Sequence, residues 1–496
     1  MARPSSRHGP HPDCLPPACP DPPYRPPSLA PAPCLTHPRP KGQDASTAQC
    51  QSFRRSSLRP FARGGKQNTR RQTPLSQGCR PVTPASPYLQ RYAKALLLGT
   101  LLATLAVNIA PGLYYDTVEW HPFNTDPLYR LRLFFPGFTL ATVVSCLLMP
   151  LFFLLIGKEL WEALVLEHGG LRGKLALVPV GMVLGGMFVS SLIWVLLTLG
   201  LETAEEAVDA RGWVMPFGSD MVLAFFFGRM IFGRGHPALQ VLLFLCILDG
   251  LIGLVVGGFT APLEYNLRAL WLILPAGAAA FGYVRLTRPY QKQSLTELER
   301  QRAGRLWPWV ILAVFSWIGM SASGLPPALA LLPLLPALPH GHHSFGLFAE
   351  AEGFLTDPLN RLSHAISAPV IVILFLFGLT RGALDLAAFG PTTWIMLGAL
   401  WLGKPLGVFG AALILKRMGR PLPNRLGLRE IAYIAGLMGI GFTVPLLALE
   451  TALPGGAMQE AARLGLGISL LLGPALVLLA RKVTPHTAKG GKAARH

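Results

Sequence analysis

The sequence predicts an all-α membrane protein with about twelve transmembrane helices and a disordered N-terminal tail. Of its 496 residues, 51% are hydrophobic and only 14% are charged, and the mean hydropathy is +0.43. A soluble chain carries about 25% charged residues, so these charges are too few to cover a soluble surface of this size. The apolar residues also gather into runs close to the roughly 20 residues that a helix needs to cross a bilayer core.

Three segments divide the chain: a tail at 1–88, a transmembrane domain at 89–485 and a short basic tail at 486–496. The first is rich in Pro, Arg, Ser and Gln and has no apolar periodicity, so it cannot bury enough surface to offset chain entropy. It also has no short apolar core typical of a signal peptide. We expect this tail to be disordered and assign it no function; a translation start downstream of it is an alternative that the sequence leaves open.

Twelve apolar runs are the candidate transmembrane helices. They lie near residues 92–111, 136–156, 175–200, 213–232, 238–259, 267–287, 306–322, 325–339, 363–380, 391–416, 428–452 and 461–481. The eighth run is short and contains several prolines, so a buried or irregular helix is the alternative there.

The basic residues predict the orientation of these helices. Lys and Arg gather after the even-numbered runs, beginning with Lys158, Arg172 and Lys174, and again in the segment 285–305. The other loops are acidic or carry few charges. By the positive-inside rule, both termini lie in the cytoplasm and the protein crosses the inner membrane several times. Basic cytoplasmic loops explain the net charge of +19 without nucleic acid as a partner.

Three ionisable residues lie inside apolar runs, where a charge costs at least about 2.5–3.5 kcal/mol. They are Asp220 in the fourth run, Asp249 in the fifth and Lys404 in the tenth. Such residues are functional candidates by default, although Asp249 and Lys404 could also form a purely structural ion pair. Glu159, at the cytoplasmic end of the second run, could equally be a solvated charge.

Two runs carry helix breakers at mid-membrane depth. In the fourth run, Pro216 and Gly218 precede Asp220. The eleventh run has breakers on both sides of Thr443: Gly436, Gly439, Gly441 and Pro445. We therefore predict broken fourth and eleventh helices, each at the centre of an inverted three-helix repeat, spans 3–5 and 10–12, as in transporters that bind their substrate between such repeats. Tight helix packing at the glycines is the alternative.

Five short segments, in order along residues 92–481, resemble the NhaA-type sodium–proton antiporters. They are FFLLIGKE at 152–159, GWVMPFGSD at 212–220, ILD at 247–249, GKPLG at 403–407 and GIGFT at 439–443. The resemblance implies a twelve-helix fold with two inverted repeats and an interface domain, whose broken helices cross at a cation site. It also implies a secondary transporter, not an enzyme, that exchanges sodium or lithium for protons and is activated by alkaline pH.

The same resemblance assigns the site residues. The residues implied to bind the cation and the proton are Asp249, Asp220, Lys404, Ser219 and Thr443, with Lys404 paired to Asp249. Glu159 is implied to belong to a pH-sensing region. The expected partners are sodium or lithium ions, protons and the lipid bilayer; we expect no cofactor and no resident metal. A homodimer is one open oligomeric state.

The departures from the family concern charge. Gly250 stands where the family has the second of two adjacent aspartates, and Cys146 stands where it has a further aspartate in the second helix. The run at 325–339 also diverges. One carboxylate fewer predicts a lower proton stoichiometry than the family's. The alternative is a transport-deficient or differently selective homologue on the same scaffold.

Overall fold

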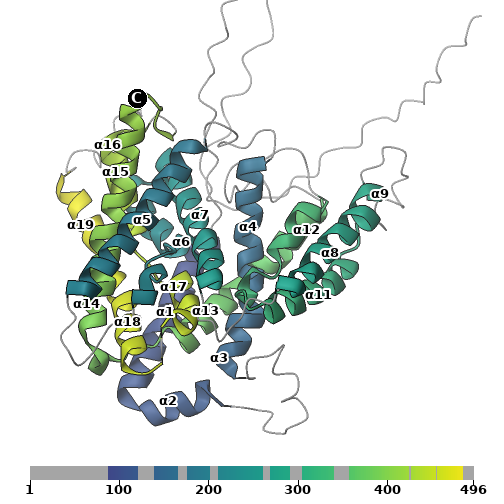
Figure 1. Cartoon of the computed structure of the whole chain (residues 1–496), viewed down its shortest axis with the longest axis horizontal. Coiled ribbons are helices and arrows are strands. Elements are labelled where there is room, and N and C mark those ends of the chain that lie inside the picture. Colours follow the sequence, from purple (N-terminus) through teal and green to yellow (C-terminus); the bar gives the residue numbers. More distant parts are fainter. Residues whose placement is uncertain are drawn as a thin grey trace, which may run out of the picture. The chain divides into compact units, whose positions relative to one another are not determined.

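The computed structural model describes the membrane domain, and its regular elements among the described residues are all helices (Figure 1). The described ranges are 88–120, 139–165, 176–200, 210–260, 269–290, 304–339, 357–423, 426–453 and 455–483. The predictions for the tail at 1–88 and for the segment 486–496 therefore fall almost wholly outside the described part of the chain.

The first half of the domain runs from α1 to the 3₁₀ segment η9. Its elements are α1 (Tyr88–Ile109), α2 (Pro111–Val118), α3 (Leu140–Thr142), the π-helical η2 (Val143–Leu148), α4 (Met149–Val165), α5 (Leu177–Gly200), η4 (Ala210–Val214), α6 (Met221–Phe232), α7 (Pro237–Thr260), η6 (Ala269–Leu272), α8 (Ile273–Gly282), η7 (Tyr283–Thr287), α9 (Arg288–Tyr290), α11 (Trp307–Ser323), η8 (Pro327–Leu329) and η9 (Leu332–Ala337).

The second half contains the later predicted spans. Its elements are α12 (Pro358–Ser367), α13 (Pro369–Arg381), η11 (Leu386–Ala388), α14 (Pro391–Gly398), the π-helical η12 (Ala399–Gly403), α15 (Lys404–Arg417), α16 (Leu428–Met438), α17 (Thr443–Ala452), α18 (Ala457–Ser469) and α19 (Leu472–Val483).

Among the described residues, eight helices are long and apolar enough to cross a membrane, or nine if the bent pair α12 and α13 forms one span. The predicted count of twelve is not confirmed. The remaining three predicted runs correspond to shorter apolar helices: Met221–Phe232, Trp307–Ser323 and Pro327–Ala337. The last of these is a pair of 3₁₀ segments, because its prolines lack the N–H groups that a continuous α-helix needs.

The outward faces of the helices suit a lipid environment. Large apolar side chains are exposed there, among them Ile109 at 78%, Phe188 at 70% and Leu270 at 80%. In water such a surface would be costly, whereas hydrocarbon solvates it well. Together with the long apolar helices, this surface makes the chain a multi-pass membrane protein.

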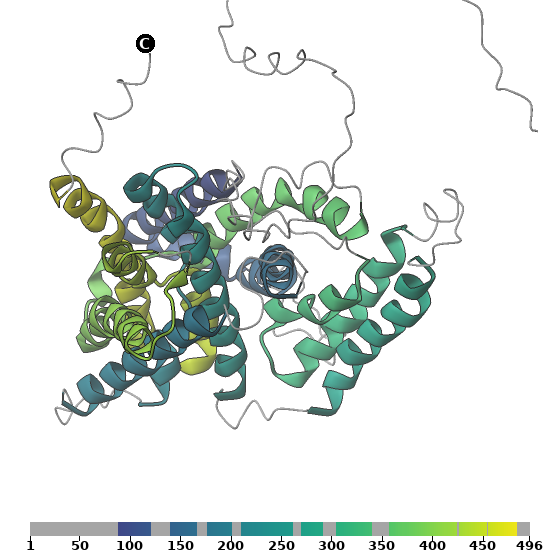
Figure 2. The ribbon, with the colours of Figure 1, turned by 90° about the horizontal axis from the view of Figure 1, so that it is seen from above.

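Helix α4 stands between two groups of helices (Figure 2). On one side it contacts α7 and α13, and on the other it packs against η8 and η9. At Gly157 the packing is tight, since an added Cβ would lie 2.3 Å from a methyl group of Leu332 in η9. The two faces of α4 thus connect the group that holds α5–α7 and α14–α19 with the group formed by α8 and α11.

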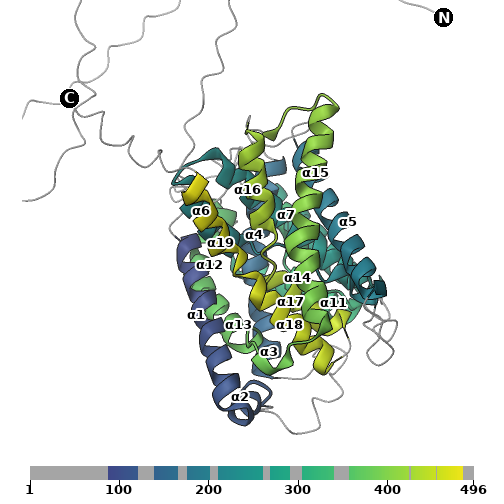
Figure 3. The same ribbon diagram turned by 90° about the vertical axis from the view of Figure 1, so that its left-hand side faces the viewer.

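The broken fourth and eleventh helices are present. The backbone is non-helical from Phe217 to Asp220, between η4 and α6, and again from Ile440 to Phe442, between α16 and α17 (Figure 3). These breaks leave backbone N–H and C=O groups that a continuous helix would pair. At membrane depth such groups persist only where protein or a water-filled cavity satisfies them.

Candidate functional site

Gly218 permits the break in the fourth helix. Its φ of +83° lies in the left-handed region, which glycine adopts without a Cβ penalty. A Cβ at this position would also lie 2.4 Å from Cγ1 of Val444, in the first turn of α17. Both the backbone turn and the close approach of the two broken helices therefore require glycine here.

Hydrogen bonds join the two breaks directly. The backbone N–H of Asp220 donates to the carbonyl of Ile440 at 2.8 Å, and the hydroxyl of Ser219 lies 2.7 Å from the carbonyl of Met438. Each break thus satisfies polar groups that the other leaves open. The two interrupted helices cross at this point, which we call the crossing: residues 217–220 and 438–443.

One buried carboxylate caps two helices at the crossing. Oδ1 of Asp220 accepts the N–H of Leu223 at 2.9 Å in the first turn of α6. Oδ2 accepts the N–H of Thr443 at 3.1 Å, at the start of α17, and a hydrogen bond from the Thr443 hydroxyl. An anion at a helix N-terminus is stabilised by the free N–H groups and the helix dipole. Asp220 is only 1% exposed, and its charge is compensated by two such termini.

A second buried carboxylate, Asp249 of α7, holds the site's ion pair. Its Oδ2 lies 2.8 Å from Nζ of Lys404, and both side chains are 0% exposed. The contact joins a buried ammonium to a buried carboxylate and is an ion pair. Oδ2 also accepts the N–H of Ser219 at 2.5 Å, and the Ser219 hydroxyl lies 2.7 Å away. Oδ1 accepts no hydrogen bond from the described residues.

Close packing of α5 and α15 fixes the position of Lys404. A Cβ at Gly407 would lie 2.2 Å from the carbonyl oxygen of Gly185, and one at Gly403 would lie 2.7 Å from Cα of Ser190. The two backbones therefore touch, as small residues allow in membrane helices. The π-helical turn η12 ends at Gly403, directly before Lys404, and such turns often occur at functional sites.

A small cavity lies at Gly250, the residue that follows Asp249 in the chain; Asp249 itself does not line it. Its volume of about 20 Å³ is enough for a water molecule. Aromatic and aliphatic side chains of α4 line one side, and polar residues of the crossing line the other: Phe152, Phe153, Ile156, Ser219, Asp220 and Thr443. A Cβ at Gly250 would have one neighbour within 4 Å, Cγ2 of Val444 at 3.3 Å.

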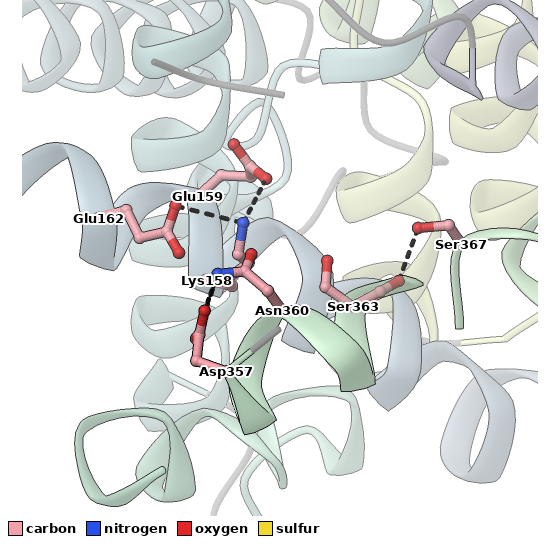
Figure 4. A network of polar contacts seen from close by, with 7 residues as sticks. All are labelled: Lys158, Glu159, Glu162, Asp357, Asn360, Ser363 and Ser367. Carbon is pink, nitrogen blue, oxygen red and sulfur yellow. Dashed lines mark hydrogen bonds and ion pairs between the residues drawn. The ribbon is translucent and has the colours of Figure 1, made fainter. Parts of the chain in front are cut away.

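Glu159 lies in a separate buried cluster, not at the crossing (Figure 4). Nζ of Lys158 lies 3.3 Å from Glu159 and 3.2 Å from Glu162, and these side chains are only 2–6% exposed. On the neighbouring α12, Asn360 donates to Asp357 at 2.9 Å. The prediction that Lys158 belongs to a cytoplasmic loop is wrong: it lies within α4 and is 1% exposed.

The sequence singled out Glu159 but not Glu162, and it did not predict that both glutamates pair with Lys158. The available signal was the spacing of Lys158 and Glu162, since residues four apart face one another on a helix. The structure brings five of the six predicted site residues together at the crossing: Asp249, Asp220, Lys404, Ser219 and Thr443. Their roles in ion binding remain predictions.

Comparisons with known proteins show the family of the chain. The family described as "Na+/H+ antiporter 1" matches residues 90–479. The Na⁺/H⁺ antiporter NhaA of Jannaschia sp. (strain CCS1) is 36% identical over 393 residues, covering 76% of this chain and 93% of that protein. NhaA of Geobacter sulfurreducens is 30% identical, and NhaA 1 of Pelobacter propionicus is 32% identical; each alignment covers 76% of this chain and 92% of the relative.

A solved structure, the sodium proton antiporter MjNhaP1 from Methanocaldococcus jannaschii, overlaps 79% of this chain and 98% of its own, with 17% identity and a TM-score of 0.41. The family match and the apolar helices define a secondary transporter of the membrane, not an enzyme. The chain belongs to the NhaA family of Na⁺/H⁺ antiporters.

Proposed function

We propose that this protein exchanges sodium for protons across the membrane, with Asp249 as the group that binds the cation and its partner Lys404 as the group that carries the proton. Lithium, which resembles sodium in its preference for oxygen ligands, is the second expected ion. The observation that carries the proposal is the fully buried pair of Asp249 and Lys404, 2.8 Å apart beside the crossing. The names of the relatives, all Na⁺/H⁺ antiporters, support the same exchange.

The charge balance of the buried site couples the binding of a sodium ion to the release of a proton. The pair of Asp249 and Lys404 is neutral overall, and both side chains are excluded from solvent. A cation that binds Asp249 would leave Lys404 as an extra positive charge, and breaking a buried ion pair costs about 3–5 kcal/mol. The cost is avoided if Lys404 releases its proton as the cation arrives. Each bound cation is thereby exchanged for one proton.

The count of carboxylates limits the stoichiometry. Asp220 is committed to capping α6 and α17, and Gly250 supplies no second carboxylate next to Asp249. One proton per cation is therefore the expected exchange, and such an exchange moves no net charge.

The hydroxyl of Ser219 can change its hydrogen-bond acceptor when a cation binds Asp249. Its hydroxyl lies 2.7 Å from Oδ2 of Asp249 and 2.7 Å from the carbonyl of Met438. A hydroxyl has one proton to donate, so it can serve one of these acceptors at a time. When it donates to Met438, its lone pairs are free to face a cation held by Asp249.

Localisation and regulation complete the proposal. The basic residues after the even-numbered runs favour cytoplasmic termini and the inner membrane as the location. Glu159, in its cluster with Lys158 and Glu162, is the candidate for regulation by pH. A homodimer is one open oligomeric state, and a mass measurement in detergent tests it.

Proteoliposomes with an imposed proton gradient test the exchange. We expect sodium to dissipate the gradient in the native protein and not in an Asp249→Asn variant. The matched control is Asp385→Asn, an aspartate outside the crossing that caps the short η11; it should transport normally. If neither the native protein nor the control moves protons in response to sodium, the transport-deficient homologue is the better description.

A further inference from the structure

The crossing offers a cation little formal charge. Asp249 is fully buried, and its Oδ2 already receives the Ser219 N–H and Lys404 Nζ, at 2.5 and 2.8 Å. Oδ1 is the atom with no hydrogen-bond partner among the described residues. Both oxygens of Asp220 are occupied by the N-termini of α6 and α17. A cation here would therefore meet one carboxylate, and its remaining ligands would be neutral oxygens.

The cavity at Gly250 adds room but no uncommitted carboxylate. Its lining combines apolar side chains of α4 with Ser219, Asp220 and Thr443, and both oxygens of Asp220 already cap helices. Its volume of about 20 Å³ suits a single water molecule. The backbone at Gly250 accepts a side chain once Val444 shifts by a few tenths of an ångström, because a Cβ there would meet only Cγ2 of Val444, at 3.3 Å. The position next to Asp249 thus holds space where a second carboxylate could stand.

Field strength decides which monovalent cation such a site prefers. A small ion such as Li⁺ or Na⁺ holds its water tightly, so only ligands with a strong negative field repay its dehydration. Larger ions such as K⁺ and Rb⁺ lose water at lower cost and accept neutral oxygens. Affinity at oxygen sites is likewise tuned by the number of charged ligands and by site rigidity.

We infer that the crossing is a weak-field site which accepts a partly hydrated monovalent cation and discriminates little between sodium and potassium. Gly250 is the residue that sets this specificity, through the carboxylate it lacks and the space it leaves. The inference rests on the proposed role of Asp249 as the exchange site. Potassium then becomes a substrate class for this chain in addition to sodium and lithium.

Cation binding to the purified full-length protein tests this inference without requiring transport. Thermal unfolding is followed while LiCl, NaCl, KCl or RbCl replaces choline chloride at constant ionic strength, because an ion that binds the folded state raises the midpoint. In the native protein we expect apparent affinities for K⁺ and Na⁺ within about tenfold of one another. Asp249→Asn should abolish the stabilisation by all four ions.

Substitutions at Gly250 separate charge from volume. Gly250→Asp should raise the affinities for Na⁺ and Li⁺, since it adds a charged ligand. The ratio of these affinities to the affinity for K⁺ should increase by at least about tenfold. Gly250→Ala fills part of the cavity without charge and should keep the native ratio. If Gly250→Asp does not fold, Gly250→Asn supplies a neutral oxygen and should shift the ratio less, in the same direction.

Three results would overturn the inference: a native preference for Na⁺ over K⁺ above about a hundredfold, an unchanged ratio in both polar variants, or the same change in Gly250→Ala as in Gly250→Asp.

Proton movement in proteoliposomes then separates this inference from the proposed exchange. Weak discrimination in binding with no ion-driven proton movement would contradict the exchange alone. Proton movement driven by sodium and not by potassium would contradict the weak-field site alone.

Discussion

The carboxylate of Asp220 receives both the N–H and the hydroxyl of Thr443, a residue 223 positions further along the chain. The same carboxylate receives the N–H of Leu223 in its own helix. A single buried side chain therefore caps the N-termini of two helices, α6 and α17. Because both contacts are made at helix N-termini, the negative charge itself contributes to the geometry of the crossing.

Replacing Asp220 should destabilise the protein in two steps. Asp220→Asn keeps an oxygen for one terminus and removes the charge, with an expected loss of about 1–2 kcal/mol. Asp220→Ala leaves three donors without their acceptor in a buried site, with an expected loss of at least about 3 kcal/mol. Thermal unfolding in detergent measures both. Equal midpoints for the two variants would mean that the side chain does not cap the helices.

Gly218 should tolerate no side chain, for two separable reasons. Gly218→Ala combines a positive φ, worth about 1–2 kcal/mol, with overpacking against Val444, worth about 1–3 kcal/mol. Gly235 provides the matched control, because its φ is +75° and a Cβ there would meet nothing within 4 Å. Gly235→Ala should therefore lose only the backbone cost. The difference between the two unfolding midpoints measures the contact with Val444, and no difference would contradict the close approach of the broken helices.

The sequence predicted the crossing because membranes make certain residues conspicuous. Asp220, Asp249 and Lys404 lie in apolar runs, where an unpaired charge is too costly to be incidental. Pro216 and Gly218 interrupt a run that would otherwise be a continuous helix. Breaks and charges are local features, so they could be read from the chain without knowing which segments meet.

The contacts between distant segments could not be predicted in this way. Nothing local pairs Asp220 with Thr443, or brings Gly407 against Gly185. The burial of Lys158 was missed for a different reason. A lysine near a helix end can extend to water along its aliphatic stem. The position of Lys158 in the run therefore left both outcomes open until the packing of α4 against η8, η9 and α12 was known.

The contact between α5 and α15 should be intolerant of added volume. Gly407→Ala would place a Cβ 2.2 Å from the carbonyl oxygen of Gly185, so the helices must separate and Lys404 must shift from Asp249. We expect a loss of about 1–3 kcal/mol in stability together with weaker sodium-driven proton movement.

Gly410, three residues further along α15, is the matched control, because an added Cβ there has no atom within 4 Å. Gly410→Ala should be neutral, or more stable by up to about 1 kcal/mol through helix propensity. Similar behaviour of the two variants would contradict the proposed role of this packing.

The ion pair at the site should show strong coupling in a double-mutant cycle. Lys404→Met leaves Asp249 buried without its cation, with an expected loss of about 3–5 kcal/mol. Combining it with Asp249→Leu removes both charges and should recover most of that stability, while transport remains absent. Lys416→Met, at the exposed end of α15, controls for the loss of a lysine in general. Additive effects of the two substitutions in thermal unfolding would show that the residues do not interact.

The cluster of Lys158, Glu159 and Glu162 should depend on its lysine in a pH-dependent manner. Lys158→Met removes the cation that lies within 3.3 Å of both carboxylates, so two buried like charges would repel one another. We expect a loss of about 3–5 kcal/mol at pH 8 and a smaller loss at pH 5, because protonated carboxyl groups need no counter-ion. The native protein and Lys158→Met are compared by thermal unfolding at both pH values, with Lys416→Met again as the control.

Adding Glu162→Gln to Lys158→Met should restore part of the stability at pH 8, since it leaves one charge where there were two. An equal loss at the two pH values, with no recovery in the double variant, would mean that Lys158 contributes through packing and not through its charge.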